Sequence, residues 1–531
     1  MKQDVIIIGS GMSGSASAWY LAQKGYSVLV IEGGEDIAST QLPLSSVDWE
    51  LKKEKQFSPV ASGRKNVGDY PVNDKNSPIS VCNFNAVGGS SLLYSAHFPR
   101  FLSSDFRLKE LEGVAKNWPI NYRDLLPFFD LNEEMVVLAG KVGDPYYPEI
   151  KKVFNSPVPL GVAGETLAMG FEQLNLHWWP SYAAINIAQN ISGRSKCHGL
   201  GPCNAGCPIG AKATANNTYL AKAPKDRLTL LSKTSASKIL FKKNEVVGVE
   251  TINSSGQVSK IFCSNVILAA GAIGTPRLLL NSLRHYDVKK FVTGYHLVGK
   301  NLMMHPLGYA QGYFPDKDIH AERGPQGAML YSLEYYRPKE KLDFELGFMM
   351  HALRGDAPVD CVKRLYKSRQ LRFGKEIYSQ FKKFFGHTLG IAVVCEDLPD
   401  VNNKVELDET EDALGQPGVK VSYTISDNSK RMMSYGLKRA REVLITAGAR
   451  KTSGFGPIRN TGWHLSGTAC MGANPNTSVV DPYGGVHGMK GLHVVDASVF
   501  VTSSCVNPAN TIQALSLYLT SKIDERIKNA G

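Results

Sequence analysis

The sequence lacks long apolar runs. None of its 531 residues lies in a stretch approaching the roughly 18 uninterrupted apolar residues that a membrane-spanning helix requires. At the N-terminus, "MKQDVIIIGSG" holds an apolar run of only four residues, which is too short for the apolar centre of a signal peptide. These absences predict a cytoplasmic chain. They leave open export of the folded chain on a signal carried by a partner subunit.

Cysteine is also scarce, and repeats are missing. The 9 cysteines are odd in number and accompany no export signal, which argues against a disulfide framework. We find no internal repeat, no low-complexity linker and no nucleic-acid-binding module. The net charge of +12 comes from basic residues that are mostly dispersed, so nucleic acid is not the expected partner. The composition is that of a globular protein with about two to four domains.

The first 34 residues carry the clearest positive signal. The buried strand predicted for "DVIII" is followed by "GSGMSG", which contains Gly9, Gly11 and Gly14. A predicted helix then ends at Gly25, and a second predicted strand, "SVLVIE", ends at Glu32. In such a unit the glycines permit a tight turn, close approach to a pyrophosphate and close helix–strand packing, while the terminal acid faces a ribose. The pattern predicts a dinucleotide site and does not separate FAD from NAD.

Six further stretches extend this pattern over the chain. They are "NAVGGSSLLYSAHFPR", "VILAAGAIGTPRLLLNS", "VGKNLMMHP", "EDLPDVNNKVELD", "WHLSGTACMG" and "GLHVVDASVFVTSSCVNPANTIQALSLYLTSKI". The second is expected to form a strand, a small-residue turn and a helix opened by Pro276. In these stretches and in their order, the chain resembles the glucose–methanol–choline (GMC) family of FAD oxidoreductases over nearly its whole length.

The resemblance implies an α/β fold with two domains. A Rossmann-like FAD-binding domain, formed by residues 1–100, 195–305 and 460–531, would be interleaved with an α+β substrate-binding domain. The substrate-binding domain would contain residues 101–194 and 306–459.

The resemblance also implies the chemistry. Oxidation of an alcohol sends a hydride to flavin N5 while the hydroxyl loses its proton, and a neutral imidazole with an ordinary pKa of about 6.5 is a suitable proton acceptor. His464 in "WHLSGTACMG" matches the family's catalytic histidine, and Asn507 in "CVNPANT" matches its second site residue. An amide can hold an oxygen but cannot take its proton at neutral pH. We therefore predict His464 as the base and Asn507 as the orienting group, and we expect His305 and His177 to be structural.

Other positions are expected beside the cofactor. By the same resemblance, Asp496 and Ala497 should lie along the phosphates and ribityl chain of the flavin. Four small residues should pass close to its isoalloxazine, where the backbone can approach: Gly88, Gly89, Ser90 and Ser91. Tyr94 replaces an asparagine found in many family members, so no specific side-chain contact is expected there.

Three cysteines in "CHGLGPCNAGCPIGAKAT" allow three interpretations. Cys197, Cys203 and Cys207 are spaced C-x5-C-x3-C-P, whereas structural zinc prefers closer pairs and four ligands. Buried thiols without a ligand are the second interpretation. The third is an iron–sulfur cluster, because thiolates are its normal ligands and the intervening glycines allow sharp turns. Three thiolates favour a 3Fe-4S cluster, and the stretch looks like the cluster segment of the GMC catalytic subunits of bacterial sugar and gluconate dehydrogenase complexes.

The function follows from these predictions. We expect an FAD-dependent dehydrogenase that oxidises an alcohol or sugar hydroxyl to a carbonyl and passes electrons through a 3Fe-4S cluster to a cytochrome subunit or a quinone. A small export or chaperone subunit would accompany such a complex. Two alternatives stay open: a cluster-free FAD oxidase that makes hydrogen peroxide from an alcohol, sugar or sterol, and a lyase that keeps FAD as a structural element.

A basic segment, residues 363–385, is a candidate docking surface. Its apolar residues fall on one predicted helical stripe and its basic residues occupy the other positions. Such a helix can lie on an anionic membrane or dock an acidic electron acceptor. It can equally pack its apolar stripe on its own domain.

Overall fold

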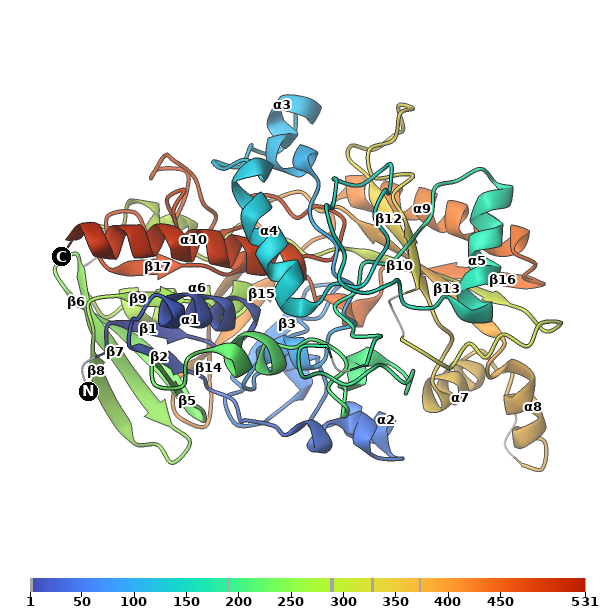
Figure 1. Cartoon of the computed structure of the whole chain (residues 1–531), viewed down its shortest axis with the longest axis horizontal. Coiled ribbons are helices and arrows are strands. Elements are labelled where there is room, and N and C mark those ends of the chain that lie inside the picture. The colour runs from blue at the N-terminus through green and yellow to red at the C-terminus, as the bar shows by residue number, and fades with distance from the viewer. Residues whose placement is uncertain (1–2, 190, 287–290, 326–328, 372–373, 531) are drawn as a thin grey trace.

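Two β-sheets organise the molecule and stand toward opposite ends in Figure 1. The computed structural model of the protein describes residues 3–189, 191–286, 291–325, 329–371 and 374–530. The sheets are mixed with helices throughout, so the predicted α/β class is confirmed.

A parallel sheet carries the N-terminal motif, with the strand order β17-β9-β1-β2-β5. Its strands are β1 (Val5–Ile8), β2 (Val28–Ile31), β5 (Leu228–Leu231), β9 (Val266–Leu268) and β17 (Leu492–Val494). All four residues of β1 are buried, as expected for a central parallel strand that is covered on both faces. Helix α1 (Met12–Gln23) joins β1 to β2 and packs on the C-terminal helix α10 (Ala509–Ala530), where Ser17 Oγ and Ser516 Oγ lie 2.9 Å apart.

Helix α6 (Gly271–Leu283) begins earlier than predicted. We expected Pro276 to open this helix, but it lies inside it. Capping explains the earlier start, because the Asp496 carboxylate accepts a hydrogen bond from Gly271 N at 2.8 Å and the Thr275 hydroxyl accepts one from Ala270 N at 3.2 Å. These contacts satisfy N–H groups that the first turn leaves without partners.

The second large sheet is antiparallel, with the strand order β16-β10-β13-β12-β11-β4. Its strands are β4 (Trp179–Pro180), β10 (Leu307–Tyr313), β11 (Leu330–Ser332), β12 (Phe348–Leu353), β13 (Thr388–Cys395) and β16 (Lys451–Phe455). Helix α9 (Asp427–Thr446) covers one face of this sheet, and α5 (Gly161–Gln173) packs on α9. Strand β13 is buried throughout, as expected for a central strand of a sheet that is covered on both faces.

Smaller elements complete the fold. Two three-stranded sheets comprise β3 (Val72–Asn76), β14 (Lys404–Glu411) and β15 (Pro417–Ser422), and β6 (Thr234–Lys242), β7 (Glu245–Asn253) and β8 (Val258–Phe262). The remaining α-helices of the described chain are α2 (Trp49–Lys53), α3 (Leu108–Glu112), α4 (Tyr122–Val136), α7 (Pro358–Lys367) and α8 (Ile377–Phe384).

The basic segment 363–385 is not one helix. It is divided between α7 and α8, with Arg369 in the left-handed region at φ 56° and residues 372–373 outside the described part. The predicted stripe is therefore wrong as a single surface. Phe373 of the predicted stripe lies outside the described residues. The other apolar members pack with Leu365 in a small cluster, so this face is used within the chain: Ile377, Phe381, Phe384 and Phe385.

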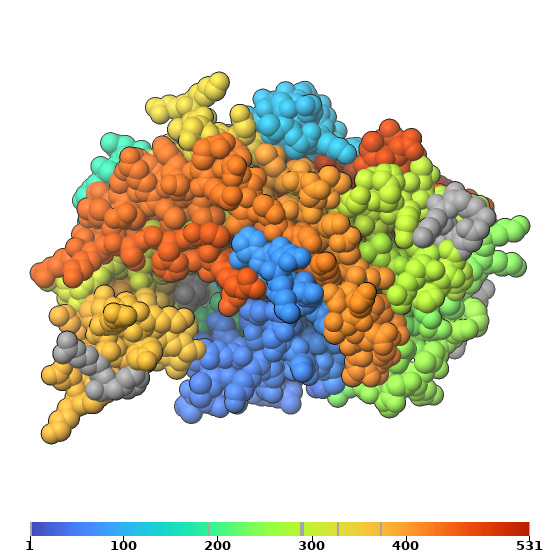
Figure 2. Space-filling model, turned by 180° about the vertical axis from the view of Figure 1, so that it is seen from behind, coloured from blue at the N-terminus to red at the C-terminus, as the bar shows by residue number. Residues whose placement is uncertain are grey.

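Seen from behind, the surface is hollowed between this gold region and the blue N-terminal segments (Figure 2). Contact between the two is made by the Glu50 carboxylate, which accepts a hydrogen bond from Val359 N at 2.9 Å. Within the described residues, no helix combines the length and apolar character needed to cross a bilayer.

Candidate active site

A cleft of about 270 Å³ lies over the carboxyl ends of β1 and β2. Most of the residues predicted to contact FAD line it, although they come from four distant parts of the chain: Gly9, Gly11, Glu32, Gly89, Ser90, Ser91, Asp496 and Ala497. Gly14 and Gly88 are not among the lining residues. Trp463 and Leu465, which flank His464, line the cleft as well.

Two glycines of the N-terminal turn, Gly9 and Gly14, are required by close backbone packing. Gly9 has φ 99°, and a Cβ there would lie 2.6 Å from the carbonyl oxygen of Ala269. A Cβ on Gly14 would lie 1.9 Å from the carbonyl oxygen of Gly9, so helix α1 packs directly on the turn. By contrast, a Cβ on Gly11 would meet nothing within 4 Å. The turn therefore offers its backbone to the cleft at the helix N-terminus, the geometry that suits a phosphate.

Two buried carboxylates border the cleft. Glu32 accepts hydrogen bonds from Ser10 N at 3.0 Å, Ser10 Oγ at 2.7 Å and Gly34 N at 2.9 Å. These donors hold the Glu32 carboxylate at the edge of the cleft, at the end of β2. Asp496 accepts from Gly271 N at 2.8 Å, and it caps the turn that begins at Ala497 by accepting from Ser498 N at 2.9 Å.

The predicted base and its partner lie side by side. His464 Nε2 is 3.1 Å from Asn507 Nδ2, and His464 Nδ1 is 2.9 Å from His305 Nδ1. His305 Nε2 is in turn 3.1 Å from the carbonyl oxygen of Ser503. Four groups from three separate segments of the chain thus form one hydrogen-bonded series.

This series fixes the tautomer of His464. The Ser503 carbonyl can only accept, so His305 Nε2 carries a hydrogen and the neutral ring presents a lone pair at Nδ1. His464 Nδ1 must then donate to that lone pair, which leaves His464 Nε2 unprotonated and facing the Asn507 amide. His305, which we expected to be structural, thereby acts on the orientation and tautomer of His464.

Burial keeps these imidazoles neutral. It lowers the pKa of His464 well below its ordinary value, with further lowering from His305 and His351. Burial likewise lowers the pKa of His305 to about 4, although the Ser503 carbonyl opposes this change. At neutral pH, His464 is therefore unprotonated.

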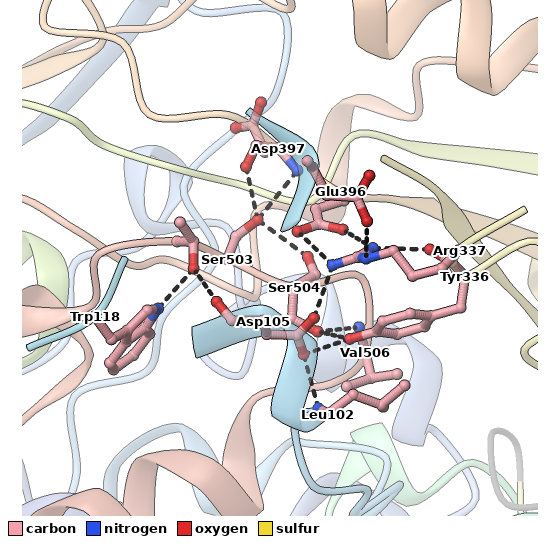
Figure 3. A network of polar contacts seen from close by, with 12 residues as sticks. Leu102, Asp105, Trp118, Tyr336, Arg337, Glu396, Asp397, Ser503, Ser504 and Val506 are labelled. Carbon is pink, nitrogen blue, oxygen red and sulfur yellow. Dashed lines mark hydrogen bonds and ion pairs between the residues drawn. The ribbon is translucent and has the colours of Figure 1, made fainter. Parts of the chain in front are cut away.

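A buried polar network holds the loop that precedes Asn507 (Figure 3). Arg337 donates to Asp105 Oδ1 at 2.8 Å and to Glu396 Oε2 at 2.6 Å, and its two partners have fully buried side chains. Tyr336 Oη donates to Asp105 and lies 2.6 Å from Ser504 Oγ. The network joins the turn before α3, segments next to the antiparallel sheet, and the C-terminal loop. It therefore fixes the position of the loop that leads to Asn507.

Asp397 extends this network to His305. Its backbone N–H donates to Ser503 Oγ at 3.1 Å, and its carboxylate accepts from Met304 N at 3.0 Å and Tyr423 Oη at 2.7 Å. Asp397 therefore ties together the segment that carries His305 and the loop that supplies the Ser503 carbonyl. Burial raises the pKa of this carboxyl to about 7, and its hydrogen bonds oppose the rise.

Two histidines that the sequence did not single out lie beside this site. His97 and His351 are both buried, with ring centroids 4.2 Å apart. Burial, His351 and His464 lower the pKa of His97, and His351 contributes to the lowered pKa of His464. His97 follows the Gly88–Ser91 segment, and His351 comes from β12. No local spacing links them, because the fold alone brings the two segments together.

His177 stands apart from these rings in a polar cluster of its own. Its Nδ1 accepts from Leu333 N at 3.0 Å, so its Nε2 donates to Asp144 Oδ1 at 2.9 Å. Tyr146 stacks against it with ring centroids 4.4 Å apart. This is a packing role.

The three-cysteine loop is held by protein groups. The Cys197 thiol accepts from Gly199 N and the Cys207 thiol from Lys212 N, both at 3.5 Å. The buried Lys212 Nζ donates to the carbonyl of Cys203 at 2.7 Å and to that of Tyr94 at 2.9 Å. Throughout the described residues, no group of three His, Cys, Asp or Glu side chains is arranged to hold a metal ion. As placed, Cys197, Cys203 and Cys207 do not form a cluster site.

Comparison with known proteins shows which family the chain resembles over most of its length. Models of the GMC oxidoreductase family match residues 3–307 and 399–516. The chain is 32% identical to 2-methyl-1,2-propanediol dehydrogenase of Mycolicibacterium austroafricanum, covering 99% of this chain and 96% of that one. It is 28% identical to 6'''-hydroxyparomomycin C oxidase of Streptomyces lividus, over 97% and 90% of the two chains. It is 24% identical to the fructose dehydrogenase large subunit of Gluconobacter japonicus, over 99% of each.

Solved structures show the same fold. Pyridoxine 4-oxidase from Mesorbium loti superposes with a TM-score of 0.66 at 16% identity, with 99% of each chain covered. Formate oxidase of Aspergillus oryzae RIB40 gives a TM-score of 0.64 at 18% identity, again over 99% of each chain.

Proposed function

The chain belongs to the GMC oxidoreductase family. Because the enzymes of this family use FAD and act on alcohol and sugar hydroxyls, we propose that this chain oxidises such a hydroxyl to a carbonyl. In this proposal His464 is the base and Asn507 is the orienting amide. One observation carries the proposal: an unprotonated His464 Nε2 faces Asn507 Nδ2 at 3.1 Å, with its tautomer fixed from behind by His305.

The residues of the cleft fit FAD. The Gly9–Gly14 turn would hold the pyrophosphate, Glu32 would face the ribose, and the turn at Asp496 and Ala497 would lie along the ribityl chain. Gly88 to Ser91 would lie against the ring system. When bound, the flavin accepts the hydride. We keep the proposed division into an FAD-binding and a substrate-binding domain, with the boundaries given above.

The chain's own residues handle the proton. A substrate hydroxyl would displace the Asn507 amide from His464 Nε2 and donate its proton there, while Asn507 Nδ2 would donate to the same oxygen and hold it in place. The charge that His464 gains is offset through Nδ1–H, which strengthens its hydrogen bond to His305. Trp463 and Leu465, on either side of His464, would exclude water from the reacting atoms.

Flavin bleaching tests this proposal. Under argon, a primary alcohol or sugar substrate should bleach the flavin of the wild-type enzyme, and His464→Ala should slow the bleaching by at least about 100-fold. Wild-type protein that is purified without flavin, or His464→Ala protein that bleaches at the wild-type rate, would refute the assignment. A lyase would convert its substrate without any bleaching.

The electron acceptor is a separate proposal. We retain a dehydrogenase that passes electrons to a cytochrome or quinone, because the fructose dehydrogenase large subunit is among the relatives and the cysteine spacing suits a 3Fe-4S cluster. A small export or chaperone subunit belongs to the same hypothesis. The three thiols, as they are placed in the structure, do not fit a cluster.

Spectroscopy separates the alternatives. Iron and sulfide contents of about three and four per chain, with an EPR signal that Cys203→Ser abolishes, would support the cluster. Iron-free protein that forms hydrogen peroxide in air at the rate at which it reduces a dye would be an oxidase instead.

A further inference from the structure

Lys212 is a buried lysine that joins the wall of the cleft to the three-cysteine loop, residues 197–207. Its Nζ donates hydrogen bonds to three carbonyl oxygens, those of Leu92 at 2.9 Å, Tyr94 at 2.9 Å and Cys203 at 2.7 Å. The first two acceptors belong to the wall and the third belongs to the loop. One side chain therefore links two segments that are far apart in the sequence.

The wall of the cleft is the segment of residues 88–94. Its part from Gly89 to Ser91 lines the cleft, beside the place proposed for the flavin ring system. Leu92 is the next residue, so a Cα–Cα step of about 3.8 Å and the hydrogen bond from Lys212 put Nζ within about 9 Å of Ser91 Cα. The Lys212 side chain therefore ends directly behind the wall.

The chain that follows Lys212 holds the same wall. The Ser91 hydroxyl accepts a hydrogen bond from Ala215 N at 3.0 Å, and the Tyr94 hydroxyl donates to the Ala213 carbonyl at 2.8 Å. The position of the wall therefore depends on this short stretch of chain, in which Lys212 makes the bonds that continue to the three-cysteine loop.

The hydrogen bonds of Lys212 fix its charge. A neutral amine has two N–H donors and one lone pair, and a lone pair would face one of the carbonyl oxygens with repulsion. Three carbonyl acceptors therefore require the ammonium form, which has three donors. The ring centroid of Tyr94 lies 5.1 Å from Nζ, within the range of a cation–π contact.

No carboxylate balances this charge. Among the described residues, neither Lys212 nor the nearby buried Arg194 forms an ion pair, and Arg194 donates instead to the carbonyl oxygens of Val136 and Ala211. Burying a charge without a counter-ion is costly. The two cations make the region behind the wall favourable for any negative charge that is added close to it.

We propose that Lys212 is a positioning residue for reduction of the flavin: it fixes the wall against the ring system and holds a positive charge behind it. The hydride brings one negative charge into the ring system, and a fixed cation in a buried site stabilises that charge. The flavin is therefore a stronger electron acceptor than it would be without Lys212. This inference rests on the proposed function, because it places the flavin in the cleft.

The midpoint potential of the flavin tests the inference without any alcohol substrate. The FAD-loaded protein is titrated against a reference dye under argon at pH 7. Lys212→Met should lower the potential by at least about 30 mV, which corresponds to a tenfold change in the two-electron equilibrium. Lys53→Met is the control, because Lys53 Nζ donates to Asn204 of the same loop at 3.1 Å but, among the described residues, makes no hydrogen bond to the wall. Its potential should stay within about 10 mV of the wild-type value.

Lys212→Gln separates the charge from the hydrogen bonds. A glutamine amide keeps two N–H donors for the carbonyl oxygens but has no charge, so the potential should fall as far as in Lys212→Met. A wild-type potential in either variant, or an equal fall in Lys53→Met, would overturn the inference. If the methionine variant loses its flavin or melts early, the glutamine variant decides alone.

Thiol labelling decides where no flavin is bound. Flavin-free wild-type protein would refute the proposed function, but Lys212→Met should still release the Cys203 carbonyl and speed iodoacetamide labelling of the three-cysteine loop at least about fivefold. Cys263 and Cys395 are internal controls for mass mapping, because both are buried outside this loop and should label at the wild-type rate. Equal labelling of the loop in the two proteins would overturn the link. If a bound flavin is bleached by no alcohol, the proposed function fails, while the potential still decides the role of Lys212.

Discussion

Replacing His305 tests how the site controls its base. His305→Leu removes the lone pair to which His464 Nδ1–H donates at 2.9 Å, and it leaves that buried N–H without an acceptor. An unsatisfied buried donor costs about 1–3 kcal/mol, and 1.36 kcal/mol corresponds to a tenfold change in rate, so the reduction rate should fall by about 5- to 150-fold. The His464 ring would also be free to carry its hydrogen on Nε2, and a protonated Nε2 could not accept the substrate proton.

Stopped-flow reduction under argon measures this effect directly. We expect His305→Leu to lower kcat much more than it raises KM, because the substrate oxygen is held by Asn507. His305→Gln should recover part of the rate, since its amide can accept from His464 and donate to the Ser503 carbonyl. The ¹⁵N shifts of labelled histidine would report the tautomer, and His493→Gln controls for the loss of a buried imidazole. Wild-type kcat in His305→Leu would refute the proposed control of the tautomer.

Two further predictions address the cofactor turn and the polar network. Gly9→Ala should purify without flavin, because its Cβ would lie 2.6 Å from the Ala269 oxygen, whereas Gly25→Ala, at φ 90° with nothing within 4 Å, should keep its flavin and lose about 1 kcal/mol of stability. Equal flavin contents would contradict this reasoning. Asp397 has its pKa raised to about 7 in the fold from an ordinary 3.8, so the folded protein retains a proton that the unfolded chain has lost. Its contribution to stability should therefore fall as the pH rises from 4 to 7, by at most about 1.4 kcal/mol per pH unit. Asp397→Asn should flatten the pH dependence of the melting temperature over this range, and an unchanged slope would exclude Asp397 as its source.

The parts of the fold with local signals could be predicted from the sequence. Strand β1, the glycine turn, helix α1 and strand β2 follow one another within the first 31 residues, and each has its own pattern of apolar or small residues. The start of α6 could not be predicted, because the carboxylate that caps it belongs to Asp496, 225 residues from Gly271. By contrast, the division between α7 and α8 has a local signal in Gly374, although no Pro marks it.

The candidate site could be predicted only in part, because some of its contacts join residues that are far apart in the sequence. His464 and Asn507 stand in recognisable motifs, whereas His97 and His351 have neighbours that are informative only after folding. The contact of His97 with His351 depends on how strand β12 is placed beside the segment after Ser91. The spacing of Cys197, Cys203 and Cys207 could not reveal that the buried Lys212 donates a hydrogen bond to the Cys203 carbonyl.

The order of strands in the parallel sheet has a consequence for synthesis of the chain. β1 is among the first segments to leave the ribosome, but β9, which pairs with it, begins at residue 266, and β17, on the far side of β9, begins at residue 492. His464 and Asn507 emerge equally late. β2 can pair with one edge of β1 early, but the other edge of this apolar strand stays open until about half of the chain has been made, so chaperone capture of the first 30 residues is important for yield.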